Sequence, residues 1–170
     1  MCLIIDEQNA KMKIANEDIV CYKLVKKVEQ EYINLIHWIE KLQFSKRTPL
    51  IYHKTIFVSP NYNEIYEPNT VKVNKTRIQK RKVKQHEHDP KVWRIGGGVL
   101  HTFKYFKSAK KYYVNYGGVL NFMDNSAQFM FLKCFIPKGT KYYNGKMDCY
   151  ETYYSYASKS LKITDEIMLI

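Results

Sequence analysis

Residues 127–136 carry the strongest strand pattern in the chain, because apolar residues occupy both of its alternating sets. One set is Phe129, Phe131, Lys133 and Phe135, and the other is Gln128, Met130, Leu132, Cys134 and Ile136. In a strand these two sets point to opposite sides of the sheet. We therefore expect a central strand that is covered on both faces.

Shorter β-branched and aromatic runs between turn signals predict further strands. These runs are residues 19–25, 50–58, 63–66, 70–73, 99–103, 150–156 and 160–163. Turns are predicted at Pro68–Asn69, at 115–118 and at Asn144–Gly145. Most connections are short, which favours antiparallel pairing of neighbouring strands.

Two segments instead repeat their apolar residues every three or four positions, the spacing of an amphipathic helix. The first is an inserted helix at about 29–43, marked by Tyr32, Leu35, Ile36, Ile39 and Leu42. The second is a short helix at about 104–113, where Phe106 and Tyr113 share a face with Lys110. We therefore expect a single α+β domain over residues 1–170, mainly an antiparallel sheet of short strands with these two helices.

The chain carries 28 Lys and Arg against 16 Asp and Glu, a net charge of +12. Such an excess creates a positive field that favours polyanions or phosphorylated ligands. A lysine-rich surface that reflects only the composition of an AT-rich genome is the alternative. The chain also has 15 tyrosines and 8 phenylalanines, residues that suit strands and recognition surfaces.

The most basic window and the aromatic residues near it have the composition of a surface that contacts phosphates and stacks on bases. Its residues are Lys72, Lys75, Arg77, Lys80, Arg81, Lys82 and Lys84, and the neighbouring aromatic residues are Trp93, Tyr105, Tyr112 and Tyr113. We expect a solvated loop or the exposed end of a hairpin at about 72–90, long enough to be mobile. A solvated charge run without a ligand remains the alternative. No reader motif is present, so sequence-specific recognition is not predicted.

A glycine-rich segment precedes the strand at 99–103 and is a second candidate for binding a phosphate. Its candidate residues are Arg94, Gly96, Gly97, Gly98, His101 and Lys104. Glycines let a backbone approach a ligand closely, and their N–H groups suit a phosphate. The spacing is neither that of a P-loop nor that of a dinucleotide fold, and a flexible strand entry is the alternative. His101 fits either an acid, base or ligand donor, or a core histidine with an internal hydrogen bond.

Other chemistry is not indicated. The four cysteines have no Cys-x-x-Cys pair, which favours reduced thiols in a cytoplasm. His86 and His88 with His53 and Asp89 form a charged loop rather than a zinc site, so we predict no metal and no cofactor. The N-terminus lacks the basic region of a signal peptide, and no segment approaches the ~20 apolar residues that span a membrane.

Several motifs in order resemble small uncharacterised proteins of phages and gut bacteria. They are Cys21–Lys23, Ser59–Pro60, Gly98–Phe103, Ser108–Ala109, Cys134–Thr140 and Tyr156–Ser158. The chain is more faintly similar to ADP-ribosyltransferase-like folds. That similarity implies a nucleotide cleft with His101, Tyr22 and Glu151 as candidate catalytic residues, although the Glu-x-Glu and Ser-Thr-Ser elements are missing.

The leading hypothesis is a non-enzymatic cytoplasmic binding protein of phage type. Its basic aromatic face would hold nucleic acid or a nucleotide-like anion and would modulate a host process such as defence. One alternative is a divergent ADP-ribosyltransferase-like enzyme. Another is a protein that docks on an acidic host protein.

Overall fold

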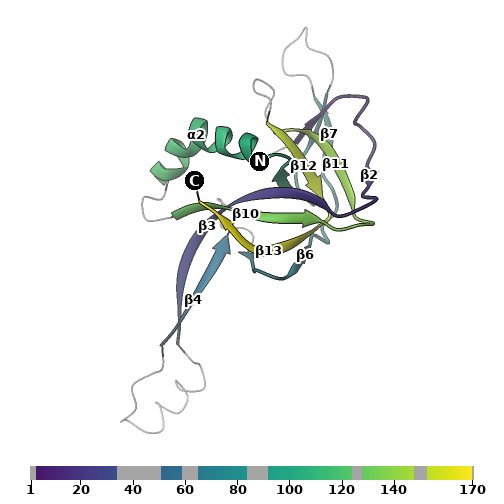
Figure 1. Cartoon of the computed structure of the whole chain (residues 1–170). Helices are drawn as coiled ribbons and strands as arrows, with labels where there is room; N and C mark the ends of the chain where they lie inside the picture. The colour runs from purple at the N-terminus through teal and green to yellow at the C-terminus, as the bar shows by residue number, and fades with distance from the viewer. Residues whose placement is uncertain are drawn as a thin grey trace, which may run out of the picture.

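The computed structural model describes residues 3–33, 51–58, 65–83, 92–123, 128–147 and 153–169. These residues form one antiparallel sheet with a single helix packed on it (Figure 1). The elements are β1 (Leu3–Ile5), β2 (Lys13–Ile14), β3 (Ile19–Ile33), β4 (Ile51–Val58), β5 (Ile65–Tyr66), β6 (Val71–Val73), β7 (Lys80–Val83), β8 (Val92–Ile95), β9 (Leu100–Phe103), α2 (Phe106–Met123), β10 (Gln128–Ile136), β11 (Lys141–Lys146), β12 (Tyr154–Ser158) and β13 (Ser160–Met168). No helix within these ranges is both long enough and apolar enough to cross a membrane.

The prediction of an α+β class is wrong, because the described residues are mainly strand with α2 as their one helix. The first part of the predicted 29–43 helix is also wrong, since Glu29 to Ile33 continue β3. Glu29 pairs with Thr55 and Ile33 with Ile51 along β4. A continuous backbone ladder with cross-strand contacts overrides a weak helical spacing here. Residues 34–43 lie outside the described residues.

The helix α2 begins at Phe106 and ends at Met123, so it is longer than the predicted 104–113 helix. It continues through Gly117 and Gly118, and the turn predicted at 115–118 is wrong. Each glycine in a helix costs roughly 1 kcal/mol relative to alanine. Packing of the first turns offsets this cost, since Ala109 is fully buried and Phe106 and Tyr112 contact the same core cluster.

The strands follow the order β6-β13-β10-β3-β9-β12-β11-β1-β8-β7, with β2 beside β11 and β4 between β3 and β5. The long strand β3 connects two regions of this sheet. Its residues 19–27 pair with β10, and its residues 26–33 pair with β4. In Figure 1 the second region extends below the body of the protein as a two-stranded ribbon.

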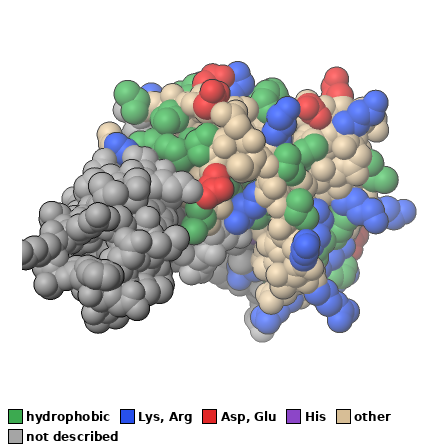
Figure 2. All heavy atoms as spheres, turned by 90° about the horizontal axis from the view of Figure 1, so that it is seen from below, with side chains coloured by type: hydrophobic (Ala, Val, Ile, Leu, Met, Phe, Trp, Pro, Cys, Tyr) green, Lys and Arg blue, Asp and Glu red, His purple; other side chains and the backbone are tan. Residues whose placement is uncertain are grey.

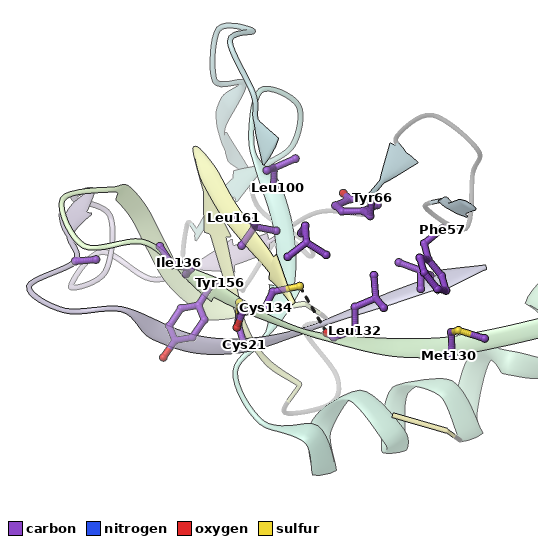
Figure 3. Close-up of a cluster of buried hydrophobic side chains, with 13 residues drawn as sticks. Cys21, Phe57, Tyr66, Leu100, Met130, Leu132, Cys134, Ile136, Tyr156 and Leu161 are labelled. Carbon is purple, nitrogen blue, oxygen red and sulfur yellow. Dashed lines mark hydrogen bonds between the residues drawn. The ribbon is translucent and has the colours of Figure 1, made fainter. Parts of the chain in front are cut away.

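The prediction that 127–136 forms a central strand is confirmed, because β10 lies between β3 and β13, and both of its faces are covered over its first half. On one face Phe129 and Phe131 pack beneath α2 in a cluster with Phe103 and Tyr153. The opposite face contributes to a second cluster (Figure 3). That cluster includes Met130, Leu132, Cys134, Ile136, Cys21, Tyr156 and Leu161. The two clusters bury Phe129 to Leu132 on both faces, whereas Lys133 and Phe135 further along the strand are partly exposed.

The turn predicted at Asn144–Gly145 is wrong, because both residues lie in β11 and pair with Tyr156 and Ser155. The glycine has a packing role instead. A Cβ added at Gly145 would lie 2.3 Å from the Ile4 carbonyl oxygen. Glycine at this position therefore lets β1 approach β11 closely.

Two cysteines face each other at the centre of the sheet, where Cys21 of β3 pairs with Cys134 of β10. Both are buried free thiols in this structure. Burial raises the pKa of the Cys21 thiol from 9.0 to about 12. Burial also raises the pKa of the Cys134 thiol, and the neighbouring Cys21 adds to that shift. Both thiols are therefore protonated and poorly nucleophilic at neutral pH. Cys2 and Cys149 lie outside the described residues.

This pair predicts a loss of stability at alkaline pH. Above about pH 9 the unfolded chain releases the thiol protons while the folded protein retains them, so the free energy of unfolding falls as the pH rises toward about 12. We expect the variant Cys21→Ala/Cys134→Ala to lose less stability than the parent between about pH 8 and pH 10.5. Urea unfolding midpoints at both pH values measure this difference. Equal losses in the two proteins would contradict the assignment.

Candidate functional site

The basic window is divided between two faces of the β7–β8 hairpin. In this hairpin Arg81 pairs with Arg94 and Lys82 pairs with Trp93. Because successive side chains of a strand point to opposite faces, Arg81 and Arg94 share one face, while Lys80, Lys82 and Trp93 share the other. The predicted loop is thus partly strand, since 72–83 includes the end of β6 and all of β7, and residues 84–90 lie outside the described residues.

The Trp93 face holds its cations by contacts inside the protein. The Nζ atoms of Lys80 and Lys82 lie 4.3 and 5.6 Å from the centroid of the Trp93 ring. Lys82 also forms an ion pair with Glu7 at 3.4 Å, and Lys80 donates a hydrogen bond to the Ala10 carbonyl. These contacts give the two lysines and Trp93 a structural role in joining the hairpin to the segment after β1.

The opposite face carries a row of basic and aromatic residues across six neighbouring strands. Residues that pair directly on adjacent strands lie side by side on the same face. The successive pairs are Arg81–Arg94, Arg94–Ile4, Ile4–Lys146 and Lys146–Tyr154. At the end of β9, the Lys104 N–H donates to the Tyr154 carbonyl at 2.8 Å. We call the residues Arg81, Arg94, Ile4, Lys146, Tyr154 and Lys104 the basic row.

The side chains of the basic row reach solvent. Arg81, Arg94, Lys146 and Tyr154 are exposed, and Ile4 and Lys104 are partly exposed. Strands lie about 4.8 Å apart, so five steps make a row roughly 24 Å long. The usual twist of about 20–25° per strand makes the row wind around the sheet rather than lie flat.

Arg81 and Arg94 lie directly opposite each other on paired strands. Like charges directly opposite each other on paired strands destabilise a sheet. Within the described ranges, neither guanidinium has an ion pair or a hydrogen bond with the protein. Guanidinium groups bind phosphates and carboxylates with two parallel hydrogen bonds. An anionic ligand would therefore offset the repulsion between these two residues.

Basic side chains outnumber acidic ones on the face seen from below. Lys and Arg side chains lie along the right and lower margins of the described surface, and others lie beside the Asp and Glu side chains of the upper margin (Figure 2). The acidic side chains on this face are few, in keeping with the net charge of +12.

The glycine-rich segment extends the hairpin instead of forming an open loop. The Gly96 N–H donates to the Gln79 carbonyl, and the Gln79 N–H donates to the Gly97 carbonyl, both at 2.9 Å. Gly98 has a φ of +79°, and a Cβ there would lie 2.3 Å from the Arg77 carbonyl oxygen. These glycines allow close backbone packing, so the phosphate prediction now depends on the side chains of Arg94 and Lys104.

His101 is engaged within the core. Its Nε2 atom lies 3.0 Å from the Gly96 carbonyl oxygen, and its own carbonyl accepts a hydrogen bond from Lys23 at 3.0 Å. The other two candidate catalytic residues, Tyr22 and Glu151, give no support to a catalytic site. Tyr22 contacts the Phe106 ring with 5.5 Å between centroids, and Glu151 lies outside the described residues. The interpretation of His101 as a core residue with an internal hydrogen bond matches these contacts.

The remaining predicted residues are spread around the fold. Lys75 and Arg77 are exposed in the connection between β6 and β7. Lys72 lies with its Nζ atom 5.3 Å from the Tyr66 ring centroid. Lys84, His86, His88 and Asp89 lie outside the described residues, as does the side chain of His53.

Sequence reasoning missed Lys146, Tyr154 and Ile4. Lys146 directly follows the turn predicted at Asn144–Gly145, and Tyr154 lies in the strand predicted at 150–156, so the prediction did not pair them. Their neighbours in the row come from the first strand of the chain and from the β7–β8 hairpin. A local period contains no information about such distant pairings, so no sequence signal placed these residues together.

The chain matches no protein-family model, no curated protein and no solved structure. The geometry of the basic row is therefore the main indication of function.

Proposed function

We propose that this protein is a non-enzymatic nucleic-acid-binding protein whose basic row holds the phosphates of its ligand. One observation carries the proposal: Arg81 and Arg94 lie directly opposite each other. Neither has a countercharge in the described part of the chain. Lys146 and Lys104 continue the positive charge along the same row.

The shape of the row suits a polymer better than a single small anion. Its cations are distributed over a length of roughly 24 Å, whereas one nucleotide phosphate would engage only the Arg81–Arg94 end. Contacts with phosphates position a nucleic acid without reading its sequence, which fits the absence of a reader motif. The net charge of +12 would add a long-range attraction that accelerates association.

Charge reversal tests the proposal. We expect Arg81→Glu/Arg94→Glu to weaken binding of a fluorescently labelled oligonucleotide by about 100-fold or more at low salt, because two phosphate contacts become repulsive. Fluorescence anisotropy titrations measure the affinity. The matched control is Lys138→Glu/Lys162→Glu, which changes the charge equally at exposed positions outside the row.

Three results would contradict the proposal. The first is that the parent protein binds no oligonucleotide. The second is that the control variant Lys138→Glu/Lys162→Glu loses as much affinity as Arg81→Glu/Arg94→Glu. The third is that poly-glutamate competes for the protein as well as an unlabelled oligonucleotide does, which would indicate an acidic protein as the partner.

A further inference from the structure

We infer that the ligand of the basic row is a single strand of nucleic acid whose bases stack on Tyr105 and Tyr154. The inference rests on the proposed function and specifies the ligand of that site. In this arrangement Arg81, Arg94 and Lys146 contact successive stretches of the backbone, and the two tyrosines receive bases at the opposite end of the row.

The first observation is the exposure of these two rings. The large hydrophobic residues exposed in the described ranges include eight aliphatic ones and only two aromatic ones, Tyr105 and Tyr154. Tyr105 is 48% exposed and Tyr154 is 43% exposed. Several other aromatic residues of these ranges, such as Phe103, Phe131 and Tyr153, are buried in the core clusters. These two rings are therefore the aromatic surface that the described residues offer to a ligand.

The second observation is that the two exposed rings touch. The Tyr105 and Tyr154 rings are 6.0 Å apart between centroids and almost perpendicular, at 83°. In an edge-to-face pair, one ring contacts the other only through its edge, so the contact itself uses neither of its flat faces. The pair therefore offers an aromatic platform of the kind that accepts bases irrespective of their identity.

The third observation is that the platform lies on the basic row and is held in place. Tyr154 is itself a member of the row, between Lys146 and Lys104. The Lys104 Nζ atom lies 5.1 Å from the Tyr105 ring centroid. The Tyr105 carbonyl accepts the Ala109 N–H at 3.1 Å, which fixes its backbone at the start of α2. Cations and rings are thus placed side by side before any ligand binds.

This combination distinguishes a single strand from a duplex. In a duplex the bases stack on one another, so only phosphates and groove edges are accessible, and Tyr105 and Tyr154 would contribute little. A single strand exposes the faces of its bases while its phosphates follow a positive surface. The two tyrosines at the end of a line of cations match the second ligand.

The test compares a labelled oligo-dT, a labelled oligo-U and a DNA duplex of equal length. We expect the parent to prefer a single strand of either kind over the duplex. Tyr154→Ala and Tyr105→Ala should each weaken single-strand binding by about 5- to 150-fold, because a base stack contributes about 1–3 kcal/mol. Duplex binding and the salt dependence should not change. Tyr154→Phe keeps the ring and should therefore retain the stacking. Ile167→Ala, which removes an exposed apolar side chain outside the row, is the matched control and should bind like the parent.

The outcomes separate the inference from the proposed function. Equal affinity for single strands and duplex, with no effect of Tyr154→Ala or Tyr105→Ala, would overturn the inference and leave the basic row as a phosphate site. Loss of binding in Tyr154→Phe would also overturn it, because a ring of equal size remains for stacking. Failure of every oligonucleotide to bind the parent would overturn the proposed function itself.

Discussion

Gly98→Ala is expected to destabilise the protein by about 3–5 kcal/mol, a large fraction of the ~5–15 kcal/mol that typically stabilises a domain. Two effects add at this position. The φ of +79° is a conformation that costs an alanine roughly 1–2 kcal/mol. The new Cβ would also lie 2.3 Å from the Arg77 carbonyl oxygen and 2.8 Å from the Ile78 Cα, so the backbone of that connection must move. Urea unfolding followed by circular dichroism measures the loss.

Gly139→Ala is a matched control for this prediction. Gly139 has nearly the same φ, +81°, and a Cβ added there meets nothing within 4 Å. It should therefore lose only the conformational part, about 1–2 kcal/mol. The difference between the two variants isolates the close packing of Gly98 against residues 77 and 78. Equal losses would show that this packing contributes little.

Phe131→Ala is expected to cost about 3–5 kcal/mol, because it removes a ring at the contact between the sheet and α2. Phe131 is fully buried and pairs with Leu24 and Met168 on the neighbouring strands. Its ring is perpendicular to that of Phe106, with 5.5 Å between centroids. Chemical unfolding measures the loss of stability, and far-UV circular dichroism shows whether α2 remains helical.

Phe135→Ala provides the comparison for Phe131→Ala. Phe135 belongs to the same strand and the same alternating set, but it is partly exposed and pairs with Lys162 and Val20. Because less apolar area is buried there, its loss should be about half as large or smaller. A loss at Phe135 equal to that at Phe131 would contradict the view that α2 covers only one end of this face.

The sequence predicted those parts of the fold in which a local pattern and the tertiary contacts agree. The two apolar sets of β10 were readable because strand burial on both faces leaves a direct mark on the sequence. The segment at 29–33 was misread because tyrosine and isoleucine at helical spacing also suit a strand, and the pairing with β4 decides between the two. The turn prediction at Asn144–Gly145 failed for a similar reason, because a tertiary contact decides the role of the glycine. Gly145 allows the close approach of β1, which comes from the far end of the chain.

The candidate site was predictable only in part. Arg81, Arg94 and Lys104 were identified from charge and from their nearness to glycines, and Tyr105 from its aromatic ring. Side chains alternate between the two faces of β7, so the basic window is divided. Lys80 and Lys82 lie on the face of Trp93, and Arg81 lies beside Arg94 on the other face. Lys146 joins them only through β1, and pairings between such distant segments are set by the whole sheet.

The central claim is that the basic row neutralises phosphates, and the salt dependence of binding tests it most directly. Each contact with a single-strand phosphate contributes about 0.7 to the slope of log affinity against log salt. Removing three cations in Arg81→Ala/Arg94→Ala/Lys146→Ala should therefore reduce the slope of the parent by about 2, whereas Lys138→Ala/Lys162→Ala should leave the slope unchanged. A row variant that binds with the same slope as the parent would contradict the claim.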